Sequence, residues 1–120
     1  GDGTSIRGWC YIDDFIHGLE LVFESDKSVG ESYNIGDPRS VITTLGLAQT
    51  ICRVLESNSK IEHLPELSAD VELRVPNIDK AKRDLNFYPG NTLEDGIMKT
   101  AQYYKSLSTK LPKLPSIFGN

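Results

Sequence analysis

The segment 1–24, GDGTSIRGWCYIDDFIHGLELVFE, decides the fold class because it contains a turn, a β-favouring stretch and an amphipathic helix in succession. Residues 6–12 are rich in aromatic and branched side chains, which favour an extended strand. In residues 14–24 apolar side chains recur at helical spacing, as Phe15, Ile16, Leu19, Val22 and Phe23. We expect Asp13 and Asp14 to cap this helix, since aspartate accepts hydrogen bonds from the first free amides. A strand joined directly to a helix predicts an α/β protein.

The remainder of the chain continues the alternation of short strands and helices. We predict strands over 32–35 and 60–64, which have the residues of short, half-buried strands. The helix between them begins at a cap supplied by Thr43 or Thr44 and ends near 57–59. Its apolar side chains form one stripe, which consists of Leu47, Ala48, Ile51 and Leu55.

Two further helices complete the pattern. One can run over about 77–85, and the other begins at Thr92, which with Asp95 forms a weaker relative of the capping box. Prolines prevent a continued helix at the end of the chain, so we expect a domain over 1–107 and an extended tail over 108–120. The chain is therefore an α/β domain of short strands and about four helices. Its small sheet either stands alone or accompanies a larger sheet supplied by other sequence.

Composition excludes several classes of protein. The 120 residues are 38% hydrophobic and 25% charged, which is close to globular usage and allows one compact domain. Basic residues form no cluster in this chain of net charge -4, so we expect no nucleic-acid partner. No apolar run approaches the roughly 20 residues that cross a bilayer, so we expect no membrane partner. Cys10 and Cys52 lack metal or disulfide spacing, which favours a cytoplasmic setting.

Four segments carry a resemblance to a known family. Residues 1–14 resemble the pattern GDGxxxRxxxYVxD, residues 33–36 are YNIG, and residues 70–81, DVELRVPNIDKA, resemble DxxxRxPDxxKA. Residues 85–97 are similar to LGWxP followed by SLEEGL. The ordered set resembles the extended short-chain dehydrogenase/reductases that act on nucleotide sugars, namely sugar 4-epimerases, dTDP-glucose 4,6-dehydratases and UDP-glucuronate decarboxylases. It implies the C-terminal substrate-binding portion of a Rossmann-type enzyme.

The resemblance implies three ligand contacts. Arg7 would contact the phosphate or sugar, Arg74 would lie on a loop over the nucleotide, and Asn34 would lie near the substrate. An arginine fork suits a diphosphate because it donates paired, charge-assisted hydrogen bonds. On the residues alone, the surface reading is favoured for both arginines, and Asn34 can equally be a turn former. Asp70 is either a ligand contact or an acceptor that orders its loop.

The family's cofactor and proton-transfer motifs are not found in these 120 residues. There is no GxxGxxG, and no tyrosine is followed by a lysine four positions later. The two histidines are too scattered to be metal ligands, so we expect no catalytic, cofactor or metal residue here. The resemblance implies that an intact, homodimeric parent binds NAD through an N-terminal part, and that this chain alone is inactive. The opening at Gly1 without methionine suggests a cut from a longer chain. The alternative is a stand-alone, non-catalytic module that binds a nucleotide sugar or another protein.

Overall fold

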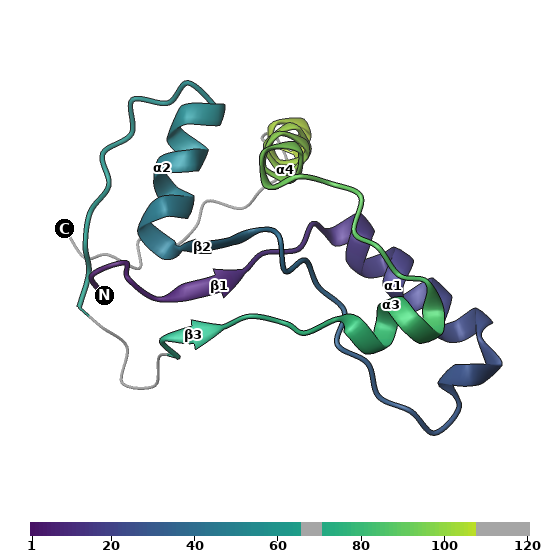
Figure 1. Cartoon of the computed structure of the whole chain (residues 1–120). Coiled ribbons are helices and arrows are strands. Elements are labelled where there is room, and N and C mark those ends of the chain that lie inside the picture. The colour runs from purple at the N-terminus through teal and green to yellow at the C-terminus, as the bar shows by residue number, and fades with distance from the viewer. Residues whose placement is uncertain (66–70, 108–120) are drawn as a thin grey trace.

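The computed structural model describes residues 1–65 and 71–107, and a small mixed sheet lies at its centre (Figure 1). Three short strands form the sheet: β1 (Ile6–Gly8), β2 (Val41–Thr43) and β3 (Leu73–Arg74). β1 lies in the middle, antiparallel to β2 and parallel to β3, with Ile6 opposite both Thr43 and Leu73. Since parallel neighbours need a crossover connection, the helices between β1 and β3 in sequence have to cover the sheet or its ends.

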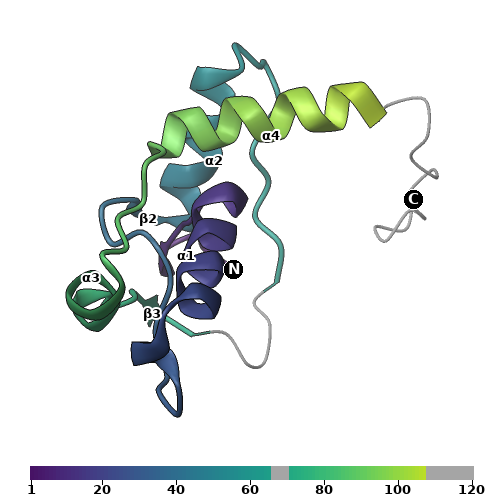
Figure 2. The same cartoon turned by 90° about the vertical axis from the view of Figure 1, so that its right-hand side faces the viewer.

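The described residues also form four α-helices and one 3-10 helix. They are α1 (Ile12–Glu24), η1 (Asp26–Ser28), α2 (Thr44–Val54), α3 (Asp79–Leu85) and α4 (Leu93–Leu107). α2 and α4 lie on one side of the sheet, whereas α1 and α3 pack together beyond one end of the strands (Figure 1). Figure 2 shows that α4 crosses α2 and extends beyond it. The α/β class with four helices agrees with the sequence prediction.

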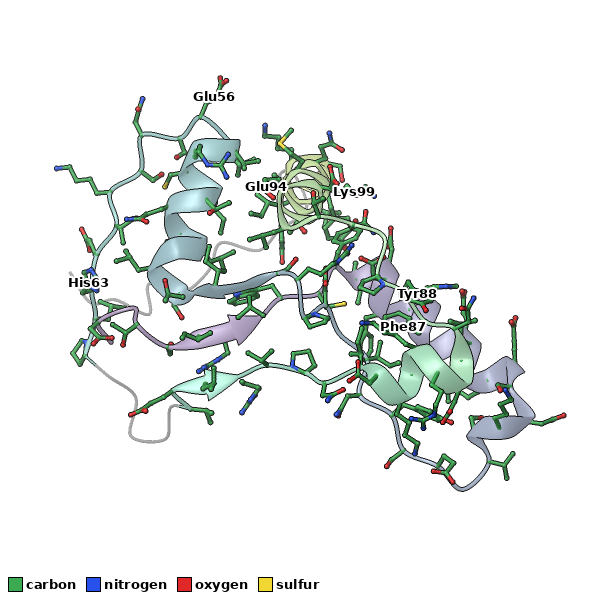
Figure 3. The ribbon with its side chains drawn as sticks, viewed as in Figure 1. Glu56, His63, Phe87, Tyr88, Glu94 and Lys99 are labelled. Carbon is green, nitrogen blue, oxygen red and sulfur yellow. The ribbon has the colours of Figure 1, made fainter. Side chains whose placement is uncertain are left out.

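The hydrophobic core lies between α1 and α3 rather than against the sheet. Its buried side chains are Ile78, Ala81, Leu85 and Phe87, and Leu21, Val22, Tyr33 and Ile35 pack against them. Phe87 is completely buried and lies beside α3 (Figure 3). α1 approaches this core closely at Gly18, where any side chain would overlap Ile35. This close approach requires glycine despite its low helix propensity.

Two predicted helix caps are confirmed. The Thr43 hydroxyl accepts a hydrogen bond from the Gly46 amide at 3.0 Å, which begins α2. At α4, the Thr92 hydroxyl accepts from the Asp95 amide at 3.1 Å, and the Asp95 carboxylate accepts from the Thr92 amide at 3.3 Å. This reciprocal pair is the capping box that the spacing indicates.

The cap predicted for α1 is wrong. α1 begins at Ile12, so both aspartates lie within its first turn, and Tyr11 occupies the cap position without a side-chain hydrogen bond. Asp14 accepts instead from the amides of Gly90 and Asn91, at 2.9 Å and 3.1 Å. The Asp14 carboxylate is thus directed toward the loop at Gly90 and Asn91 rather than toward the start of its own helix.

The two predicted strands at 32–35 and 60–64 are also wrong. Neither segment lies beside another strand in the described residues, and a strand exists only where a neighbour completes its hydrogen bonds. β2 and β3 replace them in the sheet, but they are only three and two residues long and carry no periodicity of their own. The strand predicted at 6–12 is shorter and ends at Gly8. Asp70 and the tail predicted over 108–120 lie outside the described residues.

Candidate functional site

Arg7 and Arg74 lie opposite each other on neighbouring strands. They are register partners in the parallel ladder between β1 and β3. Neighbouring strands are about 4.8 Å apart, and residues directly opposite each other project to the same face of a sheet. The fold therefore places both arginines, which are 67 residues apart in sequence, on one face.

The two guanidinium groups differ in their surroundings. Arg7 is half-buried, and its Nη1 donates to the carbonyl oxygen of Ile6 at 3.1 Å and to that of Val71. These bonds hold the Arg7 side chain against the segment that leads into β3. The Arg74 side chain is exposed, and its guanidinium group makes no hydrogen bond or ion pair within residues 1–65 and 71–107. The pair thus combines one fixed and one available cation.

The Asn34 side chain is hydrogen-bonded to the segment that follows β3. Its Nδ2 donates to the carbonyl oxygen of Asn77 at 3.2 Å, in the connection between β3 and α3. The Asn77 side chain accepts from the Asp79 amide at 2.9 Å and so starts α3. Asn34 is exposed, and its Oδ1 accepts no hydrogen bond from the described residues. Arg74 therefore lies on β3, Arg7 lies beside it on β1, and Asn34 contacts the connection that follows β3.

Pro76 is the residue that brings these segments together, and sequence reasoning missed it. A Cβ at Gly8 would lie 2.7 Å from Pro76 Cδ, and one at Gly36 would lie 2.8 Å from Pro76 Cγ. Two glycines thus allow the end of β1 and the segment after Asn34 to close on one proline ring. The glycines stand within the matched motifs, but nothing in their spacing indicates a shared partner.

Sequence reasoning also missed an ion pair between the buried Asp37 and the exposed Arg39. Asp37 is 2% exposed, and its two carboxylate oxygens accept from Arg39 Nε and Nη2, both at 2.9 Å. Arg39 Nη2 also donates to the carbonyl oxygens of Pro89 and Asn91, at 2.7 Å and 3.2 Å. Burial alone would raise the pKa of Asp37, but the hydrogen bonds and charge of Arg39 outweigh it and lower that pKa. In the sequence Asp37 resembles an ordinary turn residue between a glycine and a proline.

A second, chemically different feature is a cleft of about 770 Å³ between α2 and α4. Its walls are mostly apolar and include Trp9, Tyr11, Leu47, Ile51, Leu93 and Ile97. Trp9 is 37% exposed where it lines this cleft. Glu94 and Lys99 lie on opposite sides of α4 (Figure 3); Glu94 pairs with Arg53 of α2 at 3.0 Å. This cleft suits apolar groups rather than a diphosphate.

Cys10 lines the cleft, and its thiol is not activated as a nucleophile. Burial, together with the nearby Asp14 and Asp37 carboxylates, raises the pKa of its thiol to about 11. A thiol of this pKa stays neutral near pH 7 and is a poor nucleophile. Within the described residues, no three side chains of His, Cys, Asp and Glu gather as a metal site would require. Likewise, none of the helices described is long and apolar enough to span a bilayer.

Comparison with known proteins connects this geometry to a family. No family model matches the chain. It is 36% identical over 104 residues to UDP-glucuronic acid decarboxylase 1 of Danio rerio, covering 87% of this chain and 24% of that protein. It is 34% identical over 122 residues to dTDP-glucose 4,6-dehydratase of Neisseria gonorrhoeae, covering 92% and 35%.

Solved structures give the same result. UDP-glucuronic acid 4-epimerase from Bacillus cereus, solved with UDP-glucuronic acid and NAD, superimposes with a TM-score of 0.81 and 29% identity. The superposition covers 89% of this chain and 34% of that one. The fold is that of a portion of a Rossmann-type epimerase or dehydratase. The chain belongs to the extended short-chain dehydrogenase/reductases that act on nucleotide sugars, and it spans about a quarter to a third of the relatives it matches.

Proposed function

We propose that this chain is the nucleotide-sugar-binding portion of an NAD-dependent epimerase, dehydratase or decarboxylase, with Arg7, Arg74 and Asn34 as its ligand contacts. The observation that carries the proposal is the placement of Arg7 opposite Arg74 on one face of the sheet. A diphosphate carries negative charge on two adjacent phosphoryl groups, and two guanidinium groups on neighbouring strands supply the opposite charge and paired hydrogen-bond donors.

The chemistry of each residue supports a division of roles. Arg7 is held by carbonyl oxygens and would meet the ligand with little loss of side-chain entropy. Arg74 is exposed and would close on the phosphate from the rim. The Asn34 Oδ1 can accept a hydrogen bond from a sugar hydroxyl or a base N–H, while its Nδ2 donates to the carbonyl oxygen of Asn77.

NAD does not fit the residues of this chain. The dinucleotide pyrophosphate needs a glycine fingerprint at a helix start, and proton transfer needs a tyrosine beside a lysine, and the 120 residues contain neither pattern. In a complete enzyme we expect other sequence to hold the cofactor, which would accept a hydride from the sugar ring. The role of this chain is to bind and orient the substrate.

Thermal-shift and calorimetric titration with UDP-glucuronate and dTDP-glucose tests the proposal. We expect binding that weakens with added salt, because exposed charges are screened over about 10 Å at 0.1 M. Arg74→Lys should lower affinity about tenfold, since lysine keeps the charge but loses the paired hydrogen bonds.

The matched control is Arg83→Lys, which alters an exposed arginine on α3 whose partner is Asp84. Its affinity should equal that of the unsubstituted chain. The proposal fails if neither nucleotide sugar binds at millimolar concentration. Equal affinity of the Arg74→Lys and Arg83→Lys variants would remove Arg74 from the site.

A further inference from the structure

β3 is an edge strand of the sheet. The strand order β2-β1-β3 puts no described strand beyond it, and Figure 1 shows it at the outer side of the sheet. The Ile6 amide donates to the carbonyl oxygen of Glu72 at 2.7 Å, so the main-chain groups of Glu72 point toward β1. Successive residues of a strand direct these groups to opposite edges, so the amide and carbonyl of Leu73 point outward.

The sequence around this edge is symmetric in chemical type. Residues 71–75 are VELRV, with apolar side chains at the first, third and fifth positions and one acid and one base between them. If two copies of this segment lie antiparallel and centred on Leu73, Glu72 of each copy lies opposite Arg74 of the other. A two-fold contact between identical chains requires this kind of self-complementary surface.

The side chains of this segment are accessible. Leu73 is 63% exposed and Val75 is 43% exposed. Glu72 and Arg74 are also exposed, and neither of these two side chains makes a hydrogen bond or an ion pair within residues 1–65 and 71–107. An open edge with exposed apolar side chains is a template for pairing with another chain.

The direction of the main-chain groups fits the same arrangement. Two copies of Leu73 facing each other can exchange two hydrogen bonds, because the amide and carbonyl of each point outward. The next pairs, Glu72 with Arg74 on both sides, are then the closely spaced ones, with Cα atoms about 4.5 Å apart. Opposite charges stabilise such pairs. Centring the contact on Glu72 or on Arg74 would place like charges opposite each other, so charge selects the register about Leu73.

We propose that two copies of this chain associate through β3, antiparallel about Leu73, and form one continuous sheet with the strand order β2-β1-β3-β3-β1-β2. A strand added to an open edge pairs its main-chain groups, and a two-fold contact closes at two copies. The paired edges are short, so we expect a contact weaker than an interface of standard size. The inference does not rest on nucleotide-sugar binding.

Charge reversal tests the proposal. Sedimentation equilibrium from micromolar to millimolar concentration measures the association of the chain. Glu72→Arg and Arg74→Glu, made separately, each place like charges opposite each other twice per dimer and should weaken association roughly tenfold or more. An equimolar mixture of the two variants, one of them fluorescently labelled, restores both opposite-charge pairs. The mixture should form a 1:1 heterodimer at least as stable as the original homodimer.

Two further proteins serve as controls. Glu20→Arg makes the same charge change on α1, at a side chain that is 64% exposed, and should dimerise like the original chain. The combined variant Glu72→Arg with Arg74→Glu exchanges the two charges and should also dimerise like the original. Circular dichroism checks that all variants are folded. Hydrogen exchange of the Leu73 amide should slow as the dimer forms.

Four results would overturn the proposal: a chain that stays monomeric at millimolar concentration, charge-reversed variants that dimerise like the original, a mixture that forms no heterodimer, or a dimer in which the Leu73 amide stays unprotected. Arg74→Lys separates this proposal from the proposed function. It keeps the positive charge and should dimerise normally while it binds nucleotide sugars less tightly. Failure of nucleotide sugars to bind a chain that dimerises would count only against the proposed function.

Discussion

Asp37 retains its charge although its side chain is almost completely buried, because Arg39 donates to both of its oxygens. Arg39 then reaches the carbonyl oxygens of Pro89 and Asn91, so one ion pair joins segments about fifty residues apart. Burying a carboxylate costs free energy unless it is paired and hydrogen-bonded. This pair therefore links distant segments of the fold, and the hydrogen bonds and charge of Arg39 hold the pKa of Asp37 below its ordinary value.

The replacement Asp37→Asn should destabilise the fold by about 1–2 kcal/mol near pH 7. The loss is limited because water solvates the exposed Arg39 guanidinium once the carboxylate is removed. A lowered carboxyl pKa adds stability above the unfolded-state value of about 3.9, and that stability disappears as pH falls through the folded-state value. The difference between the two proteins should therefore shrink below about pH 4. Urea unfolding at pH 7 and pH 3 measures this change. Asp13→Asn, an exposed change on α1, is the control, and equal losses in both variants would contradict the prediction.

At the scale of elements, α1 is positioned by the absence of a side chain at Gly18. Alanine is the better helix former by about 1 kcal/mol, but its methyl group would overlap Ile35. The packing of α1 on Ile35 therefore takes precedence over local helix propensity.

We expect Gly18→Ala to destabilise the protein by about 1–3 kcal/mol, because overpacking outweighs the gain in helix propensity. Gly96→Ala on α4 is the matched control, since a Cβ there would lie 3.3 Å from Tyr11 Cβ and needs only a slight adjustment. Urea unfolding of both variants measures the effect. A Gly18→Ala protein as stable as the original would show that α1 does not sit so closely on Ile35.

At the scale of the whole molecule, two surfaces of different chemistry are separated. The arginine pair lies on the sheet near β3, whereas the apolar cleft opens between α2 and α4. The cleft is a gap in packing, because the apolar side chains of the two helices line about 770 Å³ that no described side chain fills.

Filling that gap should stabilise the fold. Ala101→Leu on α4 adds three carbon atoms to the lining of the cleft, and burial of about half of them is worth about 1 kcal/mol. Gln102→Leu adds an apolar side chain at an exposed position of the same helix and should give no gain. Thermal unfolding of the two variants gives the comparison. Equal midpoints would mean that the cleft stays open to water around the new side chain.

The sequence by itself determined the helices, two of their caps and the family. Thr43, Thr92 and Asp95 act within one turn of their own position, so local spacing is sufficient to predict their hydrogen bonds. The same is true of the apolar stripes, whose period follows from helix geometry.

Only the tertiary structure decided which segments pair and which residues meet. The strand expected at 32–35 has no neighbour, and Asp14 serves a loop 76 residues away instead of its own helix. The alignment of Arg7 with Arg74 depends on the register of β1 and β3, which are three and two residues long. The physical reason is that strand pairing and buried charge pairs draw their stability from groups distant in sequence, whose positions no local pattern encodes.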